Sequence, residues 1–461
     1  MCGVLGIHAP GRDVARIAYF GLFALQHRGQ ESAGIAVSDG DRVTALRDMG
    51  LVTQVFSEDA LQGLRGEAAI AHCRYSTTGG ARWSNAQPIV QHGSTRTVAL
   101  GHNGNLTNTT ALREELASRG VKLRSTSDTE VIAALLANDE RPLEDAVAAT
   151  MAKLQGAYTV VVLAEGKLLG FRDADGIRPL VVGRLDEDVV LASETCALDL
   201  IGADFVREVD PGELVVIDES GLHSRQAVAE HEGGALCIFE FIYFARPDSK
   251  LRSVELHGAR VRMGERLAAE APADADLVIP IPDSGTPAAI GFARASGIPF
   301  GEGLIKNRYV GRTFIQPDQA IREHGIKTKF NPLGDVSGKR VVVVNDSIVR
   351  GTTTRQIVAM LFEEGALEVH VRVSSPPIVS PCFYGVDMAA EEELIAAARS
   401  VEEVRAAIGA TSLVYLSLDG LQAATRRPEE AFCRACLTRR YPTSVPTDLA
   451  LAKNRFEPAV A

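Results

Sequence analysis

Short apolar runs separated by glycine and asparagine turns fill the first half of the chain, up to about residue 235. Examples are GIAVSD, EAAIAHC, TVALGHNG, YTVVVLAEG, KLLGFRD, DVVLASE and GELVVID. Runs of this length and composition predict β-strands, and helical patterns interrupt them at 111–118 and 129–137. Strands and helices that occur in blocks indicate a layered α+β domain.

The pattern changes after about residue 255 to a repeated order of strand, loop and helix. Buried strands are predicted at 276–281, 340–344 and 368–373, with a helix after the first and another ending near Gly365. This alternation is typical of a doubly wound parallel sheet. The polar, glycine-rich stretch 230–235 between the two patterns predicts a linker, so we expect domains over 2–235 and 236–461.

Composition adds that this is a chain with sizeable cores, since 46% of its 461 residues are hydrophobic and 23% are charged. The net charge of −11 argues against non-specific nucleic-acid binding but leaves room for a local basic pocket. The first residues lack the basic and apolar segments of a secretory signal, and no apolar run approaches the ~18 residues that cross a bilayer. Seven cysteines in such a chain favour catalysis or metal binding over disulfides, and we expect a cytoplasmic protein.

Cys2 directly follows the initiator methionine, and its small side chain favours removal of Met1. The freed α-amine would have a pKa of roughly 7.7–8.0, so it could accept a proton near neutral pH. A thiol and an amine on one residue form a nucleophile and its base. Taken alone, a cysteine at position 2 is more often a chance occurrence than a nucleophile.

Four downstream segments change this balance, namely QHRGQESAG at 26–34, HCRYSTTG at 72–79, GHNGNL at 101–106 and SDTE at 127–130. Each one singly is consistent with an ordinary turn or a helix cap. In this order after Cys2 they resemble the class II glutamine amidotransferase domain, which has the N-terminal-nucleophile hydrolase fold. The resemblance covers roughly residues 2–235.

That resemblance implies that Cys2 attacks the side-chain amide of glutamine and forms a thioester. Asn103 and the backbone N–H of Gly104 would form the oxyanion hole, where donors must already point at the developing charge.

The resemblance also assigns the residues that bind glutamine. Arg74 would pair with the α-carboxylate, a task that suits a bidentate guanidinium, and Asp128 would receive the α-ammonium group. Thr77 would lie in the glutamine pocket, and Arg28 and Gly29 in the segment that orients the cysteine.

The second half carries a candidate phosphate site, because residues 340–353 read RVVVVNDSIVRGTT. Four valines predict a buried strand, and the polar residues after it lie where open α/β sheets bind ligands. A glycine followed by threonines at the start of a helix is a phosphate cradle. An ordinary strand-to-helix turn with a capping threonine is the alternative.

This segment resembles the type I phosphoribosyltransferase fingerprint, in which two adjacent acids bind the ribose hydroxyls. Here the pair is Asn345 and Asp346, so the first acid has become an amide. The resemblance implies a Mg²⁺ ion near Ser284, Asn345 and Asp346. It also implies a loop around the 5-phosphate that contains Ser347, Ile348, Val349, Arg350, Gly351, Thr352 and Thr353.

Two further segments belong to the same predicted site. The PDSGT turn contains Asp283, Ser284 and Gly285 and resembles the pyrophosphate loop of that fold. Residues 306–332 contain six Lys or Arg against two acids and show no clear period. Such a long loop could be merely a solvated basic segment, but we favour a lid that closes on a polyanionic substrate.

Four cysteines form a candidate metal site, because Cys433 and Cys436 make a CxxC pair while Cys237 and Cys382 lie far away in sequence. Zinc, an iron–sulfur cluster and no metal are all consistent with this spacing. Cys73 and Cys196 stand in apolar surroundings and are interpreted as packing residues.

The segments ALCIFEFIYFARPDS, PPIVSPCFYGVDM and EEAFCRACLTRRYP resemble the glutamine phosphoribosylpyrophosphate amidotransferases, in their iron–sulfur-containing bacterial branch. This family converts phosphoribosyl pyrophosphate (PRPP), glutamine and water to 5-phosphoribosylamine, glutamate and pyrophosphate, the first step of purine biosynthesis. The resemblance implies a structural [4Fe–4S] cluster, a homotetramer, and inhibition by purine nucleotides such as AMP, GMP and ADP. It also implies an apolar channel that carries ammonia between the two sites.

Two other hypotheses fit parts of the chain. Another class II amidotransferase, such as a glucosamine-6-phosphate or asparagine synthase, is disfavoured by the loop at 345–353. A PRPP-binding regulatory protein without catalysis is favoured by Asn345 and disfavoured by the set of residues from Cys2 to Asp128.

Overall fold

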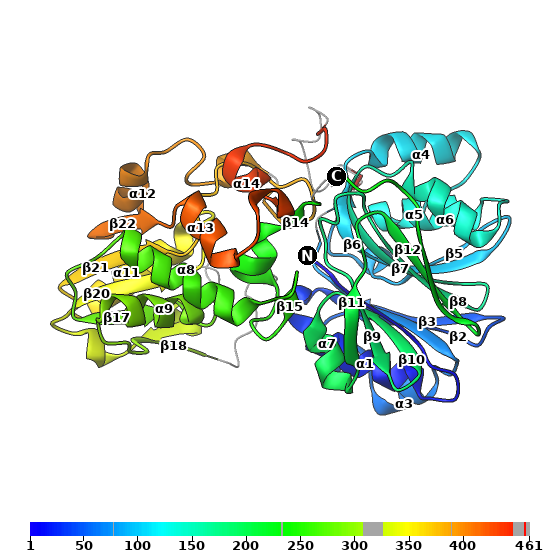
Figure 1. Cartoon of the computed structure of the whole chain (residues 1–461), viewed down its shortest axis with the longest axis horizontal. Coiled ribbons are helices and arrows are strands. Elements are labelled where there is room, and N and C mark those ends of the chain that lie inside the picture. The colour runs from blue at the N-terminus through cyan, green and yellow to red at the C-terminus, as the bar shows by residue number, and fades with distance from the viewer. Residues whose placement is uncertain (77, 232–233, 308–325, 389, 446–455, 458–461) are drawn as a thin grey trace.

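The computed structural model describes the chain except residues 77, 232–233, 308–325, 389, 446–455 and 458–461. Figure 1 shows two lobes side by side, with the first half of the sequence in one and most of the second half in the other. Among the described helices, none is both long and apolar enough to span a membrane.

The first lobe contains two antiparallel sheets. The seven-stranded sheet has the order β11-β9-β10-β1-β4-β2-β3 and the six-stranded sheet the order β13-β12-β8-β7-β6-β5. The strands of the first sheet are β1 (Gly3–His8), β2 (Ser32–Ser38), β3 (Val43–Met49), β4 (Ala68–Arg74), β9 (Val181–Leu185), β10 (Asp188–Ala192) and β11 (Asp204–Glu208). Those of the second are β5 (Ile89–His92), β6 (Thr97–Leu106), β7 (Gly156–Ala164), β8 (Lys167–Arg172), β12 (Glu213–Asp218) and β13 (Gly221–Gln226).

Each sheet of this lobe is covered on both faces. One apolar cluster, with Val4 of β1 and Val161 of β7, fills the space between the sheets. The outer face of the seven-stranded sheet packs against α1 (Val14–Ala24), α2 (Val52–Val55), α3 (Glu58–Gln62) and α7 (Thr195–Ile201). The other sheet packs against α4 (Thr109–Ser118), α5 (Asp128–Ala137) and α6 (Leu143–Met151). Burial on both faces explains why β1, β2, β4 and β7 are continuous apolar runs, and the predicted layered α+β domain is confirmed.

The second lobe is built on a parallel sheet of order β17-β20-β21-β22. Its strands are β17 (Leu277–Pro280), β20 (Arg340–Asn345), β21 (Glu368–Val373) and β22 (Ser412–Tyr415). One face packs against α8 (Leu256–Glu270), α9 (Thr286–Ser296) and α13 (Leu418–Thr425), and the other against α11 (Thr352–Glu363) and α12 (Val401–Ile408). The predicted doubly wound sheet is therefore confirmed.

Short elements complete the chain and connect the lobes. β14 (Leu236–Cys237) pairs in parallel with β23 (Phe432–Cys433), so the start of the second half meets the C-terminal region. The π-helix η3 (Glu240–Phe244) follows β14, and α14 (Ala435–Thr438) follows β23. The other short elements are η1 (Gln26–Arg28), η2 (Trp83–Asn85), β15 (Lys250–Leu251), β16 (Val254–Glu255), β18 (Leu304–Lys306), β19 (Phe330–Pro332), η5 (Gly334–Val336), η6 (Glu391–Glu393) and η7 (Glu429–Ala431).

Candidate active site

Cys2 lies where the two sheets of the first lobe meet. It directly precedes β1, which pairs with β4 and β10 in the middle of the seven-stranded sheet. Its side chain is mostly buried, with the residue 7% exposed. The backbone N–H of Cys2 donates to Oδ1 of Asn103 at 3.2 Å, and its thiol donates to the carbonyl of Tyr75 at 3.5 Å. The backbone nitrogen of Cys2 therefore lies next to β6 of the opposite sheet, and its thiol lies next to the residue that follows β4.

Asn103 has a free donor at this position. The residue is fully buried, its Oδ1 accepts from Cys2, and its Nδ2 has no hydrogen-bond partner among the described residues. A buried donor without a partner costs about 1–3 kcal/mol. This cost is removed when an oxygen atom of a ligand arrives, which fits the predicted oxyanion hole.

The backbone at Gly104 excludes any other residue. Its φ angle is +152°, and a Cβ atom there would lie 2.0 Å from the carbonyl oxygen of Ala157. Gly104 pairs with Tyr158 inside the ladder between β6 and β7. The HNG segment is thus part of a strand, as predicted for the run TVALGHNG, and the alternative of an ordinary turn does not apply to it.

Arg74 lies at the end of β4 and is buried. Its guanidinium donates to the carbonyls of Thr78, Gly79 and Gly80 at 3.0–3.1 Å and lies 3.5 Å from the carboxylate of Glu31. A glutamine carboxylate would have to replace some of these contacts. The role of Arg74 in binding glutamine stays a prediction.

Asp128 begins α5 and is buried. Its carboxylate accepts from the backbone N–H of Leu106 at 2.9 Å and lies 3.8 Å from Nδ1 of His102. The chain thus brings Asp128 next to the strand that carries Asn103. Thr77, the other predicted pocket residue, lies outside the described residues.

Arg28 contacts Cys2 and Gly29 packs against Arg74, while their role in orienting the cysteine stays a prediction. Nε of Arg28 donates to the carbonyl of Cys2 at 2.9 Å. A Cβ atom on Gly29 would lie 2.5 Å from the carbonyl carbon of Arg74. Both residues are therefore packed tightly around the site, and no larger residue fits at position 29.

Glu457, near the C-terminus, reaches the loop after β4 and was missed by the sequence analysis. Its Oε1 accepts from the N–H of Gly80 at 2.7 Å and from the hydroxyl of Thr126 at 2.6 Å, and its carboxylate pairs with Arg82 at 2.9 Å. Burial would raise the pKa of this carboxyl, but the hydrogen bonds and Arg82 lower it overall. A separation of 377 residues from Gly80 leaves no local signal for this contact.

The phosphoribosyl half has its polar residues at the carboxyl ends of β17 and β20. These strands are parallel neighbours, so their ends meet at one edge of the sheet. Asp346 accepts from the hydroxyls of Ser284 and Ser347. Burial raises the pKa of this aspartate, against the effect of both serines. One carboxylate and two hydroxyls thus lie together, and their role in binding Mg²⁺ and ribose stays a prediction.

Both ends of the Asn345 amide are engaged. Nδ2 donates to the carbonyl of Ser347 at 2.7 Å, and Oδ1 accepts from the N–H of Asp346 at 3.1 Å. Asn345 therefore holds the start of the predicted phosphate loop. Gly351, with a φ angle of +76°, ends that loop and precedes the first turn of α11, where Thr352 and Thr353 lie.

Two exposed charged residues of the predicted site, Arg350 and Asp283, each form an ion pair with a neighbouring side chain. Arg350 pairs with Glu393, and Asp283 pairs with Lys306. Residues 308–325 of the predicted lid lie outside the described residues.

Cys237, Cys382, Cys433 and Cys436 line one small enclosed cavity, although they come from three distant segments. The rest of its lining is apolar or aromatic, with Ile177, Phe239, Tyr384, Val386, Ala435 and Tyr441. Burial raises the pKa of Cys237 to about 11, and burial together with the other thiols raises the pKa of Cys433 and Cys436. No three His, Cys, Asp or Glu side chains among the described residues are arranged to hold a metal ion. Cys73 and Cys196 pack in the core against α1 and lie away from this cavity.

Comparisons with known proteins cover the whole chain. Residues 72–200 match the glutamine amidotransferase domain family. The chain is 52% identical over its full length to the amidophosphoribosyltransferase of Synechococcus elongatus, of which it covers 95%. It is 46% identical to that of Bacillus subtilis, over 98% of this chain and 96% of the relative.

A solved structure agrees with these relatives. The B. subtilis glutamine PRPP amidotransferase in complex with ADP and GMP superposes with a TM-score of 0.91 at 45% identity. The match covers 97% of this chain and 98% of that one. A structure described as the allosteric regulatory enzyme of purine biosynthesis matches with a TM-score of 0.92, also at 45% identity, and covers 97% of each chain.

Proposed function

This chain belongs to the amidophosphoribosyltransferase family, and on that premise we propose which of its residues carry each step of the reaction. It is an enzyme of purine biosynthesis that combines a class II glutamine amidotransferase domain with a type I phosphoribosyltransferase domain. The regulatory protein without catalysis is not favoured by these relatives.

In the glutaminase half, we propose that Cys2 attacks the amide carbon of glutamine. The carbonyl oxygen becomes an oxyanion that Asn103 Nδ2 and the N–H of Gly104 stabilise. The C–N bond then breaks, ammonia leaves after taking up a proton, and water hydrolyses the thioester to glutamate. The observation that carries this proposal is the buried Nδ2 of Asn103, which has no partner among the described residues and lies beside Cys2.

Removal of Met1 is a necessary part of this proposal. Met1 is buried, and the nitrogen of Cys2 already lies 3.2 Å from Oδ1 of Asn103. After cleavage this nitrogen would be an α-amine that can take a proton from the thiol. Arg74 and Asp128 would then hold the two ends of the glutamine backbone.

In the second half, we propose that ammonia attacks C1 of the ribose and pyrophosphate leaves. Asn345 and Asp346 would bind the ribose hydroxyls, the loop 347–353 the 5-phosphate, and residues 283–285 the pyrophosphate. The oxygen atoms of Ser284, Asn345 and Asp346 suit Mg²⁺, which prefers oxygen ligands and would neutralise the leaving group. Ammonium is not a nucleophile, so an apolar path between the sites is required.

We further propose that the four cavity cysteines hold a [4Fe–4S] cluster. The support is the donor set, because four thiols from three segments face a single apolar cavity. The cluster would connect these three segments structurally and would take no part in the reaction. Iron and sulfide analysis of protein purified without oxygen tests this proposal. Protein that contains zinc but no iron would refute the assignment of an iron–sulfur cluster.

The proposal also includes inhibition by nucleotides and assembly into an oligomer. The B. subtilis relative was solved with ADP and GMP, and we propose that purine nucleotides such as AMP, GMP and ADP inhibit this enzyme too. We also propose a homotetramer in the cytoplasm. Inhibition assays and the mass of the particle in solution check both points.

Replacement of Cys2 separates the two half-reactions. Cys2→Ala should abolish synthesis of phosphoribosylamine from glutamine, because no ammonia is released. Synthesis from ammonium salts at high pH should persist, since the second site is intact. The assay measures glutamate and pyrophosphate, which wild type forms one-to-one, and glutamine-dependent activity in the variant would refute the role of Cys2.

A further inference from the structure

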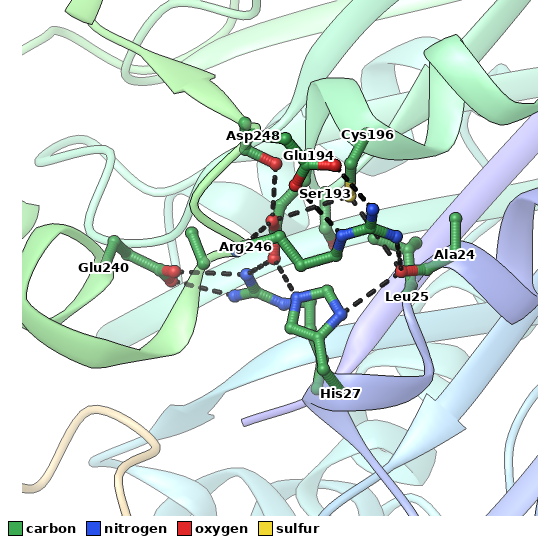
Figure 2. A network of polar contacts seen from close by, with 12 residues as sticks. Ala24, Leu25, His27, Ser193, Glu194, Cys196, Glu240, Arg246 and Asp248 are labelled. Carbon is green, nitrogen blue, oxygen red and sulfur yellow. Dashed lines mark hydrogen bonds and ion pairs between the residues drawn. The ribbon is translucent and has the colours of Figure 1, made fainter. Parts of the chain in front are cut away.

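A buried network of charged side chains lies where the two lobes meet, directly behind Cys2. Figure 2 shows Glu194 among His27, Cys196, Arg246 and Asp248, with Glu240 reaching in from the other side. Glu194 caps the start of α7 in the first lobe, whereas Glu240 begins the π-helix η3. The network therefore joins the two halves of the sequence.

Arg28 connects this network to the nucleophile. Its Nε donates to the carbonyl of Cys2 at 2.9 Å. Its Nη1 donates to Glu194 and also to Glu240 at 3.1 Å, and its Nη2 donates to Glu240 at 2.8 Å. A planar guanidinium held on three edges has a single orientation. The position of the Cys2 backbone is thus tied to both glutamates.

Glu194 is held from several sides and stays ionised. Its Oε1 contacts His27 Nε2 at 2.7 Å as well as Arg28, and its Oε2 accepts from Ser249 Oγ at 2.7 Å and from the N–H of Arg246 at 2.8 Å. Burial would raise the pKa of this carboxyl, but the charges of His27 and Arg28 lower it well below its usual range.

Glu240 is shared between two arginines. Besides Arg28, it lies 3.8 Å from Nη1 of Arg178, which donates through Nε to the carbonyl of Tyr384 at 3.0 Å. All four charged side chains, Arg28, Arg178, Glu194 and Glu240, have no solvent exposure. Two buried cations are thus balanced by two buried anions, and each carboxylate is needed for this balance.

From this geometry we infer that Glu194 and Glu240 are positioning residues for Cys2. They fix the guanidinium of Arg28, and its Nε fixes the Cys2 carbonyl and hence the thiol relative to Asn103. A π-helix within a chain is frequently found at functional sites, and η3 here presents Glu240 from the second half. The inference rests on the proposed role of Cys2 as nucleophile.

The test compares glutaminase kinetics of Glu240→Gln and Glu194→Gln with wild type. Glutamine keeps the shape of the side chain but removes the charge and one acceptor of each bidentate contact. We expect kcat for glutamine hydrolysis to fall about tenfold or more, because the thiol is displaced from the reacting carbon. The KM for glutamine should stay within about twofold, since neither residue contacts the predicted pocket.

Synthesis from ammonium salts provides the internal reference, because it does not use Cys2. It should stay within about twofold of wild type in both variants. Glu213→Gln is the matched control variant, since Glu213 is also a buried glutamate paired with an arginine, Arg207, in the first lobe. That variant should leave kcat for glutamine unchanged.

Two outcomes would overturn the inference. The first is wild-type kcat in both network variants, and the second is an equal loss of kcat, ammonia-dependent activity and activity in the Glu213→Gln control. If Glu240→Gln does not fold, Glu240→Asp is the second variant, because it keeps the charge on a side chain that is shorter by one methylene. It should lower kcat for glutamine by a smaller factor and leave ammonia-dependent activity unchanged. Cys2→Ala separates this test from the proposed function, because an active Cys2→Ala protein refutes the nucleophile itself.

Discussion

Asn345 stands where the family resemblance expects an acid, and its amide is built into the phosphate loop. An aspartate could not donate to the carbonyl of Ser347, which now lies 2.7 Å from Nδ2. A carboxylate there would face that carbonyl and lose a hydrogen bond in a site that is only 7% exposed. The amide therefore has a structural reason that sequence alone could not reveal.

Asn345→Asp should consequently have two opposite effects. Without ligands the protein should lose about 1–3 kcal/mol of stability, the cost of a buried polar group without its partner. With PRPP the added charge should strengthen Mg²⁺ binding by about 1.5–3 kcal/mol, so kcat/KM at limiting Mg²⁺ should rise roughly tenfold or more. Thermal melts without ligand and Mg²⁺ titrations of activity measure the two effects separately. Identical titration curves would mean that the amide replaces the acid fully.

The environment of Glu194 predicts how the stability of the protein depends on pH. Its pKa is lowered in the fold, so its ion pairs stabilise the protein above the carboxyl pKa of the unfolded chain, about 4.3. Below that pH the unfolded chain binds a proton that the folded chain does not, and this stabilisation is lost. The other charged groups of this cluster are His27, Arg28, Arg246, Asp248 and, through Arg28, Glu240.

Glu194→Gln should therefore be less stable than wild type by about 3–5 kcal/mol at pH 7, because Arg28 loses a buried partner. The difference in free energy of unfolding between wild type and the variant should become smaller as the pH falls from 5 toward 3. Denaturant unfolding at several pH values checks this, and a constant gap over that range would contradict an ionised Glu194.

At the scale of elements, the sequence predicted most of the framework. The helices expected at 111–118 and 129–137 are α4 and α5, and the valine run is β20 of the parallel sheet. Hydrophobic period and length suffice for such elements. The HNG segment ends the predicted strand run TVALGHNG, although an Asn-Gly pair alone also signals a turn. The pairing of β6 with β7 over Gly104 keeps it extended.

Contacts between distant segments could not be predicted from the residues. Cys237, Cys382 and the CxxC pair meet only after folding, so spacing offered them only as a candidate metal site, and the choice of an iron–sulfur cluster came from a resemblance. The network of Glu194 and Glu240 had no local signal at all, because its members contact Arg28 across 166 and 212 residues.

The C-terminal segment that carries Glu457 should restrain the loop after β4. The Gly80 N–H donates to the Glu457 carboxylate, and Arg113 lies over the ring of Phe456 at 4.8 Å. Glu457→Ala removes the acceptor, so the Gly80 amide should exchange with solvent about tenfold faster or more, as expected for a hydrogen bond to a charged group of about 1.5–3 kcal/mol. Hydrogen exchange read by mass spectrometry measures this. Glu219→Ala, an exposed surface change, is the control, and unchanged exchange at Gly80 would refute the restraint.

At the scale of the whole molecule, the cysteine cavity and Cys2 are linked by one chain of contacts. Arg178 lies beside Cys237 and Cys382. Burial would lower the pKa of Arg178, but these thiols as anions, together with Glu240, raise it overall. It also lies beside Glu240, which holds Arg28 and through it Cys2. The two halves of the chain therefore share a buried interface. An apolar cluster that contains Met1, Ile177 and Phe432 agrees with this.

Removal of one cavity cysteine tests how much the fold depends on the proposed cluster. Thiolates from three segments that bind one group convert its binding free energy into folding free energy. Cys433→Ser should therefore yield colourless, poorly soluble protein without iron. A loss of about 3 kcal/mol or more would lower the melting temperature by roughly 6–12 °C, on the scale of about 2–4 °C per kcal/mol for domains of this size.

Cys73→Ser is the matched control, because Cys73 is equally buried but lies outside the cavity. Its thiol donates to the carbonyl of Leu25 at 3.2 Å, a bond that a serine hydroxyl can also form. This variant should keep its iron and its colour. Iron content, visible absorption and melting temperature are measured on both proteins. An iron-free wild type, or a Cys433→Ser protein as stable as Cys73→Ser, would mean that the four thiols pack the cavity without holding a cluster.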